Sequence, residues 1–218
     1  MKMKSTIDVI LRRIRAKQRG WVFTAKDFAD ITSRNAIGVT LHRLAKIGVI
    51  RKIGYGIYDF PAQHPKIGKL GPTLDAITSA ITTRTGDIIQ PSSAQLANQL
   101  GLDNQVPAKP AYITSGKAVK KKIANYPITF DHSKFLNKNS WSINSAKVIN
   151  VLHYMGKGNI TDDMINKCRK ILNRRDKAQL KNNLKQLPYW IIPYILKIIR
   201  TKNENTVRSK QRRQEAIF

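Results

Sequence analysis

The stretch TSRNAIGVTLHRLAKIGVIRKIGYGIYDF, residues 32–60, holds the pattern that most restricts how this chain can fold. Its apolar residues recur at the spacing of one face of an α-helix, at Ile37, Leu41 and Leu44. Ser33 precedes this helix in the N-cap position, and Gly48 follows it where helices commonly end. Two strand-like runs then surround residues 54–56, whose glycines suit a tight turn. The stretch therefore predicts a helix followed by a β-hairpin.

The preceding residues extend this pattern into a small domain over residues 1–61. A first helix, capped by Ser5 or Thr6, has one apolar face formed by Ile7, Ile10, Leu11 and Ile14. The run WVFT is typical of a short strand, and Thr24 with Asp27 has the spacing of a capping box that begins a second helix. The predicted order is helix, strand, helix, helix, hairpin, which is the order of a winged helix-turn-helix.

The rest of the chain divides into three segments by pattern. Residues 62–135 begin with a linker of Pro, Gly and Lys and then alternate helical and strand-like runs, which indicates a small middle α+β unit. Residues 136–200 show helical periodicity throughout and predict a helical C-terminal segment. Residues 201–218 are polar, cationic and unpatterned, as in a basic flexible tail. The predicted fold class is α+β.

The charge of the chain points to a polyanionic partner. The 218 residues include 40 Lys and Arg against 13 Asp and Glu, a formal net charge of +27. A compact body with this charge repels itself unless a polyanion binds, so nucleic acid is the first partner to consider. Residues 189–199 are the most apolar run, but they are short and interrupted by Pro193, so we expect a buried helix and no membrane association.

The residue content also restricts location and chemistry. Cys168 is the only cysteine, which excludes an internal disulfide and suits a reduced compartment, and no signal-peptide pattern is present at the N-terminus, so we expect a cytoplasmic protein. The four histidines are scattered without metal-ligand spacing. The only two glutamates, Glu204 and Glu215, lie in the last segment, and two-metal catalysis needs clustered carboxylates. We expect no metal, no cofactor and no enzymatic activity.

The predicted helix between Ser33 and Gly48 is the candidate DNA-reading element. If its apolar face is buried, a rotation of about 100° per residue turns its polar residues outward. Arg can pair with a guanine edge, Asn with an adenine edge, and Val can meet a thymine methyl, whereas Lys and the hairpin suit phosphates. The alternative is an ordinary solvated helix face. The charge of residues 1–61 argues against this alternative, because they hold 13 Lys and Arg and only 4 acidic residues. The predicted DNA-binding residues are Arg19, Ser33, Arg34, Asn35, Val39, His42, Arg43, Lys46, Arg51, Lys52 and Tyr55.

Two further groups of basic residues have two interpretations each. A lysine run in a strand-like stretch is either an edge strand protected by charge or a second surface for nucleic acid or an acidic protein. Residues 136–218 hold 18 Lys and Arg against 5 acidic residues, and their cations form either a solvated helix face or a surface for RNA or an acidic partner. The residues of this second basic surface are Lys120, Lys121, Lys122, Lys167, Arg169, Lys170, Arg174 and Arg175.

The segments RGWVFTAKDF and LHRLAKIGVIRKIGYGIYDFP resemble the AbiEi-like family of type IV (abortive infection) antitoxins, in particular its DUF6088 branch. The resemblance spans about residues 15–115 nearly continuously. It implies an N-terminal winged helix that binds inverted repeats in double-stranded operator DNA and represses its own operon. It also implies a C-terminal part that counters a nucleotidyltransferase-type toxin. By position, the family's DNA-reading helix contains Arg34, Asn35, His42 and Arg43, and its wing contains Arg51, Lys52 and Tyr55.

These observations lead to three functional hypotheses. The first is a non-enzymatic antitoxin and DNA-binding autorepressor with a role in phage defence. The second is an RNA-binding or ribosome-associated protein that uses residues 136–218 and has no regulatory DNA binding. The third is an adaptor that chiefly binds an acidic toxin. The sequence leaves open whether the toxin is contacted directly.

Overall fold

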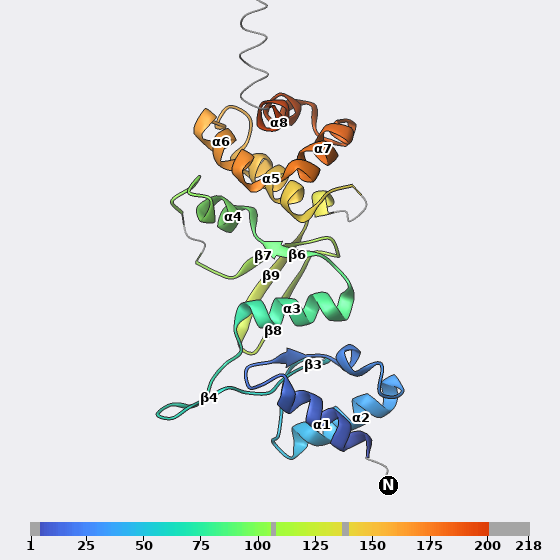
Figure 1. Ribbon diagram of the computed structural model, residues 1–218. Coiled ribbons are helices and arrows are strands. Elements are labelled where there is room, and N and C mark those ends of the chain that lie inside the picture. The colour runs from blue at the N-terminus through green and yellow to red at the C-terminus, as the bar shows by residue number, and fades with distance from the viewer. Residues whose placement is uncertain (1–4, 106–107, 137–139, 201–218) are drawn as a thin grey trace, which may run out of the picture. The chain divides into compact units, whose positions relative to one another are not determined.

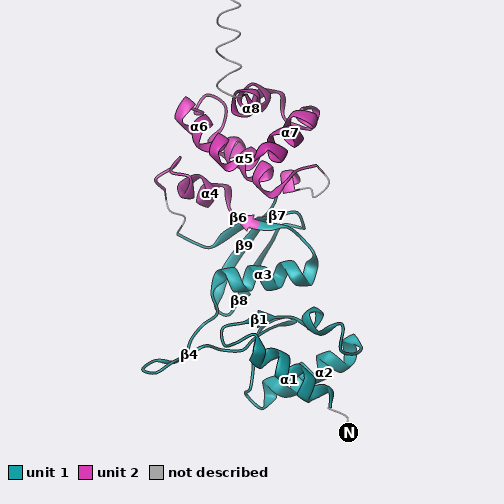
Figure 2. Ribbon diagram, in the orientation of Figure 1, with its two compact units in different colours: residues 1–89, 108–132 teal, residues 90–107, 133–218 magenta. Residues whose placement is uncertain are grey.

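The computed structural model describes residues 5–105, 108–136 and 140–200 (Figure 1). The chain divides into two compact units, which Figure 2 shows in different colours. The first comprises residues 1–89 and 108–132, and the second comprises residues 90–107 and 133–218. The predicted boundary at residue 135 lies close to a passage between the units, whereas the predicted boundary at residue 61 lies inside the first unit. The predicted tail, residues 201–218, lies outside the described residues.

The first unit begins with a helical and β-hairpin part in the predicted order. Its elements are α1 (Thr6–Ala16), β1 (Val22–Phe23), η1 (Ala25–Phe28), α2 (Arg34–Lys46), β2 (Arg51–Gly54) and β3 (Ile57–Asp59). Ser5 caps α1, and Ser33 caps α2, as the sequence predicts. Thr24 and Asp27 form the predicted capping box, but the helix that follows is one turn of 3-10 helix. The backbone bonds of this turn and of the residues after it join positions three apart, from Ala29 N–H to Lys26 and from Ile31 N–H to Phe28, so no α-helix forms here.

The three short strands form an antiparallel sheet in the order β1-β3-β2. One face of this sheet packs on α1, η1 and α2 through a cluster of fully buried side chains that includes Phe23, Phe28, Ile37 and Leu41. Gly48, just after α2, has φ +76°, a conformation that glycine adopts without strain. The chain therefore turns directly from α2 into the hairpin.

The remainder of the first unit is a helix and a second sheet. Its elements are β4 (Gln63–His64), β5 (Gly68–Lys69), α3 (Leu74–Thr85), β7 (Ala111–Thr114), β8 (Val119–Ile123) and β9 (Tyr126–His132). Together with β6 (Ile89–Pro91), where the chain passes to the second unit, the strand order is β6-β7-β9-β8. β7 is parallel to β9, and β8 is antiparallel to β9 and lies at the edge. This arrangement agrees with the α+β prediction.

A second hydrophobic cluster joins the two parts of the first unit. Val22 of β1 and Ile57 of β3 are buried in it together with Ile77 and Ile81 of α3 and with side chains of the four-stranded sheet. The three-stranded sheet therefore has a hydrophobic core on each face. Residue 61 is not a domain boundary, because the second core contains residues from both sides of it. The hydrophobic periodicity of each element could not reveal this, because both faces of such short strands are apolar.

The second unit is helical. It contains α4 (Ser93–Gln99), η2 (Lys134–Leu136), α5 (Ile143–Met155), α6 (Asp162–Ile171), α7 (Arg174–Asn182), η3 (Leu184–Gln186), η4 (Tyr189–Ile191) and α8 (Ile192–Ile199). Residues 148–152 of α5 are all buried, so this helix lies at the centre of the unit. Ile195 and Ile198 of α8 are buried, and Pro193 lies in its first turn, where a missing N–H costs little. In the described part of the chain, no helix has the length and apolar character needed to cross a bilayer.

An ion pair ties α1 to the turn after η1 and makes this contact sensitive to acid. The Arg13 guanidinium donates to both carboxylate oxygens of Asp30, at 2.6 and 2.7 Å, and these hydrogen bonds lower the pKa of Asp30 to about 2 from its ordinary 3.8. Because the pKa is depressed in the folded state, the stabilisation is present above about pH 4 and is lost as the pH falls toward 2.

We expect an NMR titration of the Asp30 carboxyl group to give a pKa of about 2 in the native protein. In the Arg13→Gln variant the pKa should move toward 3.8, because the guanidinium that stabilises the carboxylate is gone. An Asp30 midpoint near 3.8 in the unmodified protein would contradict the assigned ion pair.

Candidate nucleic-acid interface

The outward face of α2 carries the residues that were predicted there. Ile37, Leu41 and Leu44 are at most 1% exposed, so they anchor the helix in the core. The opposite face is exposed, at Asn35, Val39, His42, Arg43 and Lys46. Ile47, which the sequence did not single out, adds a second exposed apolar side chain beyond the helix end. The helix therefore presents amide, imidazole, guanidinium and aliphatic groups side by side.

Ser33 has a structural role at the start of this face. Its Oγ accepts a hydrogen bond from the backbone N–H of Ala36 at 3.4 Å. This satisfies one of the backbone donors that a helix N-terminus leaves free. Ser33 thus fixes where α2 begins and, with it, which way Arg34 and Asn35 are directed.

The hairpin divides the predicted wing residues into two kinds. Lys52 is exposed, and Tyr55 at the turn is 90% exposed. Arg51 is instead half-buried, and its guanidinium donates to both carboxylate oxygens of Asp59, at 3.0 and 2.5 Å, and to the carbonyl of Leu70 at 2.6 Å. Asp59 is only 1% exposed. Arg51 therefore holds the hairpin together through its Nε and Nη2 groups.

Arg19 is likewise engaged within the protein. It donates to the carbonyl of Pro61 at 3.1 Å, and its guanidinium lies 4.8 Å from the centre of the Phe60 ring. These contacts fasten the chain leaving β3 to the segment before β1. The sequence could not distinguish Arg19 and Arg51 from free cations, because their partners are distant in sequence. Pro61 lies 42 residues from Arg19, and Asp59 lies 8 residues from Arg51.

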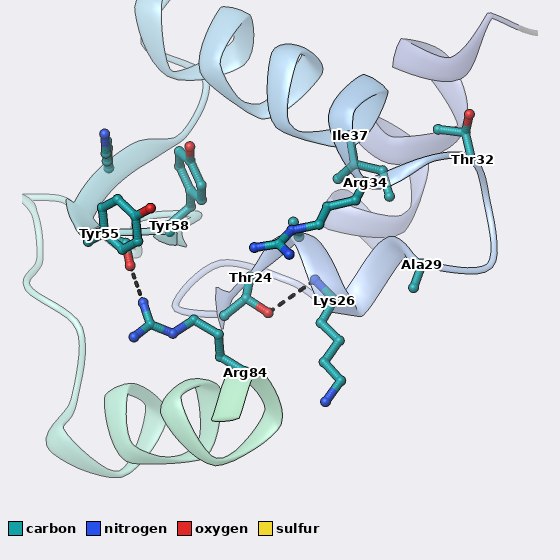
Figure 3. A pocket seen from close by; sticks show the side chains of 12 residues that line it. Thr24, Lys26, Ala29, Thr32, Arg34, Ile37, Tyr55, Tyr58 and Arg84 are labelled. Carbon is teal, nitrogen blue, oxygen red and sulfur yellow. Dashed lines mark hydrogen bonds between the residues drawn. The ribbon is translucent and has the colours of Figure 1, made fainter. Parts of the chain in front are cut away.

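A basic cavity of about 770 Å³ lies beside the N-terminal end of α2 (Figure 3). Four of its lining residues are cationic and none is acidic; the cations are Lys26, Arg34, Lys52 and Arg84. Figure 3 shows Arg34 extending from α2 across the cavity, with Tyr55 and Tyr58 on the hairpin side. Sequence reasoning missed Lys26 and Arg84, because Lys26 follows a helix cap and Arg84 lies in a segment assigned to another domain.

Arg84 fixes the hairpin turn against α3. Its Nη1 donates to the carbonyl oxygen of Tyr55, and its guanidinium lies 6.0 Å from the centre of the Tyr55 ring. The side chains of Lys26, Arg34 and Lys52 have no hydrogen-bonding or ionic partner among the residues that the structure describes. Three unpaired cations in one cavity generate a positive potential that favours a negatively charged ligand.

The residues of the predicted second basic surface differ in their surroundings. The lysines at 120–122 are exposed on the edge strand β8. Lys167 pairs with Asp163 at 2.8 Å and donates to the carbonyl of Gly101. Arg169 donates to the carbonyls of Lys197 and Ile198 at the end of α8, where a cation is favourable. The three remaining residues, Lys170, Arg174 and Arg175, are exposed.

Within the described ranges, no three side chains of His, Cys, Asp or Glu are grouped so that they could bind a metal ion. Cys168 is fully buried, and burial raises the pKa of its thiol to about 11. A thiol with this pKa stays protonated and inert near neutral pH.

The fold and the site together define a basic α+β protein in which an exposed helix face adjoins a cavity of unpaired cations. The chain belongs to DUF6088, a family of unknown function, whose model matches residues 9–180. No curated protein matches the chain.

The Arg51–Asp59 pair is expected to stabilise the hairpin. In Asp59→Asn, Arg51 loses its charged acceptor at a largely buried position, and we expect the free energy of unfolding to fall by about 1–3 kcal/mol. The exposed Asp131→Asn on β9 is the matched control and should change it by less than about 0.5 kcal/mol. Urea unfolding followed by circular dichroism measures both, and equal values for the two variants would refute the role of the pair.

Proposed function

We propose that this protein is the antitoxin of a type IV, AbiEi-like toxin-antitoxin system and a DNA-binding autorepressor of its own operon. It acts in the cytoplasm without catalysis and counters a nucleotidyltransferase-type toxin. The part of the first unit from α1 to β3 is a winged helix in this proposal, with α2 as the recognition helix and the β2-β3 hairpin as the wing. The observation that carries the proposal is the exposed, base-compatible face of α2 beside three unpaired cations.

The chemistry of the α2 face supports major-groove reading. Arg43 can donate two hydrogen bonds to a guanine edge, Asn35 can pair with an adenine edge, and Val39 suits a thymine methyl group. His42 offers a further donor or acceptor, and Lys46 suits a phosphate that fixes register. A recognition helix is about the width that the major groove accepts.

We propose a different role for Arg34 from that of its neighbours on α2. Because Arg34 extends toward the hairpin and joins Lys26 and Lys52, it suits a backbone phosphate at the edge of the groove. Tyr55 projects from the wing tip and can contact the same strand. Inverted repeats in the operator would then engage two copies of the chain related by a two-fold axis.

The RNA-binding alternative rests on the cations of the second unit. Lys167 and Arg169, two of its five candidate residues, already bind carbonyl or carboxylate oxygens within that unit. Among the described residues, three of the five candidates remain without such a partner, which favours the DNA-binding proposal. Competition between operator duplex and structured RNA at equal salt distinguishes the two hypotheses.

The DNA-binding part is tested with Arg34→Ala/Arg43→Ala. Loss of one base contact and one phosphate contact should weaken operator binding by roughly tenfold to several hundredfold. The base contact alone contributes about 1–3 kcal/mol to the binding free energy. Electrophoretic mobility shift with the operator duplex measures the effect. The control Arg12→Ala/Arg15→Ala removes the same charge from the exposed side of α1 and should bind nearly as the native protein does. Unchanged binding by the Arg34/Arg43 variant would overturn the recognition-helix assignment.

The antitoxin part is tested by co-expression with a nucleotidyltransferase-type toxin, for which the proposal expects a gene beside that of the antitoxin. We expect the native protein to restore growth to cells that produce this toxin, and the Arg34→Ala/Arg43→Ala variant to restore it equally when both genes are under a foreign promoter. Neutralisation is assigned to the C-terminal part, which these substitutions do not touch. Failure of the native protein to restore growth would refute the antitoxin role.

A further inference from the structure

The lysine-rich strand β8 lies beside the hairpin. The backbone N–H of Ala124, one residue after β8, donates to the carbonyl of Ile53 in β2 at 3.0 Å. A second cavity, of about 330 Å³, is lined by Lys121 and Lys122 together with Tyr55 and Arg84. The edge of the four-stranded sheet and the tip of the hairpin therefore border the same space, although about 65 residues separate them in sequence.

A third cavity, of about 510 Å³, completes the connection. Lys122 lines it together with Lys52 and Arg51. Each pair of cavities shares lining residues. Tyr55 and Arg84 line both the first and the second cavity. Lys122 lines both the second and the third, and Lys52 lines both the first and the third. The three cavities thus surround the hairpin and share its residues. We call those of their cations that have no carboxylate partner among the described residues the hairpin basic surface: Lys26, Arg34, Lys52, Arg84, Lys121 and Lys122.

No carboxylate that the structure describes lies among the residues around the hairpin basic surface. None of the residues that line the three cavities is acidic. Two carboxylates bind lining residues from outside the cavities: Asp59 is buried and bound to Arg51, and Asp27 accepts hydrogen bonds from Thr24. Like charges brought together without counter-charges repel one another, and a bound polyanion relieves this repulsion.

Protection of a free sheet edge accounts for only part of this arrangement. Lysines on an edge strand do prevent pairing with another chain. That role can be met anywhere along the strand and on either face, and it does not require the lysines to line cavities with cations from α2, β2 and α3. The shared cavities need a second explanation, and a ligand with several negative charges supplies it.

We infer that Lys121 and Lys122 contact backbone phosphates of the same DNA duplex that α2 reads, so that the interface extends from the winged helix onto β8. This inference rests on the proposed function, namely that the first unit binds duplex DNA. Lysine contacts to phosphate position the protein and add affinity, but they carry no sequence information. They contribute a salt-dependent part of the binding energy, because each neutralised phosphate releases counterions.

The test compares the full-length protein with Lys121→Gln/Lys122→Gln on an operator duplex over a series of salt concentrations. Each lost phosphate contact should make the negative slope of log K against log salt shallower by about 0.9. At 0.1 M salt this is a loss of about eightfold in affinity for one lysine and about sixtyfold for both. The difference should shrink as salt approaches 1 M. The ratio of operator to scrambled-duplex binding should stay unchanged.

The matched control is Lys181→Gln/Lys185→Gln, which removes the same charge from two exposed lysines of the second unit. We expect its slope to equal that of the native protein. Circular dichroism checks that both variants keep the fold, which the exposure of all four lysines favours.

The outcomes separate this inference from the proposal beneath it. If the native protein binds the operator and the Lys121/Lys122 variant keeps the native slope, the extension onto β8 is wrong while the DNA-binding function stands. If the control variant loses as much slope as the test variant, net charge explains the effect and the inference is overturned. If the native protein binds no duplex at any salt concentration, the proposed function and the inference both fail.

Discussion

The first unit depends on the burial of β3 from both sides. Tyr58 packs into the cluster formed with α1, η1 and α2, and its ring stacks near Phe23, whereas Ile57 packs into the cluster formed with α3 and the second sheet. Asp59, the third residue of the strand, is buried and bound to Arg51 and thereby satisfied. A charged group can be buried at such a position only because the guanidinium and its hydrogen bonds compensate for lost water. Without this strand the two cores would separate.

The double burial of β3 has a direct consequence for the candidate site. Because β2 and β3 are held between two cores, the hairpin turn is placed beside α3, where Arg84 binds the Tyr55 carbonyl. The same constraint sets Lys52 near β8, so cations from four separate elements surround one hairpin. Their mutual repulsion opposes folding, and the hydrophobic contacts of the two cores must exceed it. Such a balance is reasonable in a protein whose proposed ligand is a polyanion.

The sequence predicted the local structure well where a signal lies within a few residues. Ser5, Thr24 and Ser33 cap helices as expected, and the apolar face of α2 is buried as its spacing indicates. The second predicted helix is a single 3-10 turn and not an α-helix. The site was predicted less completely. Arg19 and Arg51 donate hydrogen bonds within the protein, which the sequence did not indicate. Lys26 and Arg84 line the cavity but were not predicted, and the lysines of β8 could not be assigned to the hairpin.

The sequence by itself determined the element order, the helix caps, the outward face of α2 and the excess of positive charge. These properties depend on residue types and on neighbours within one or two turns of the chain. Only the tertiary structure decided which cations are paired and which are free, and which of them share a cavity. Asp59 neutralises Arg51, and Lys122 lines one cavity with Lys52, because segments distant in sequence pack together. No local pattern encodes such packing.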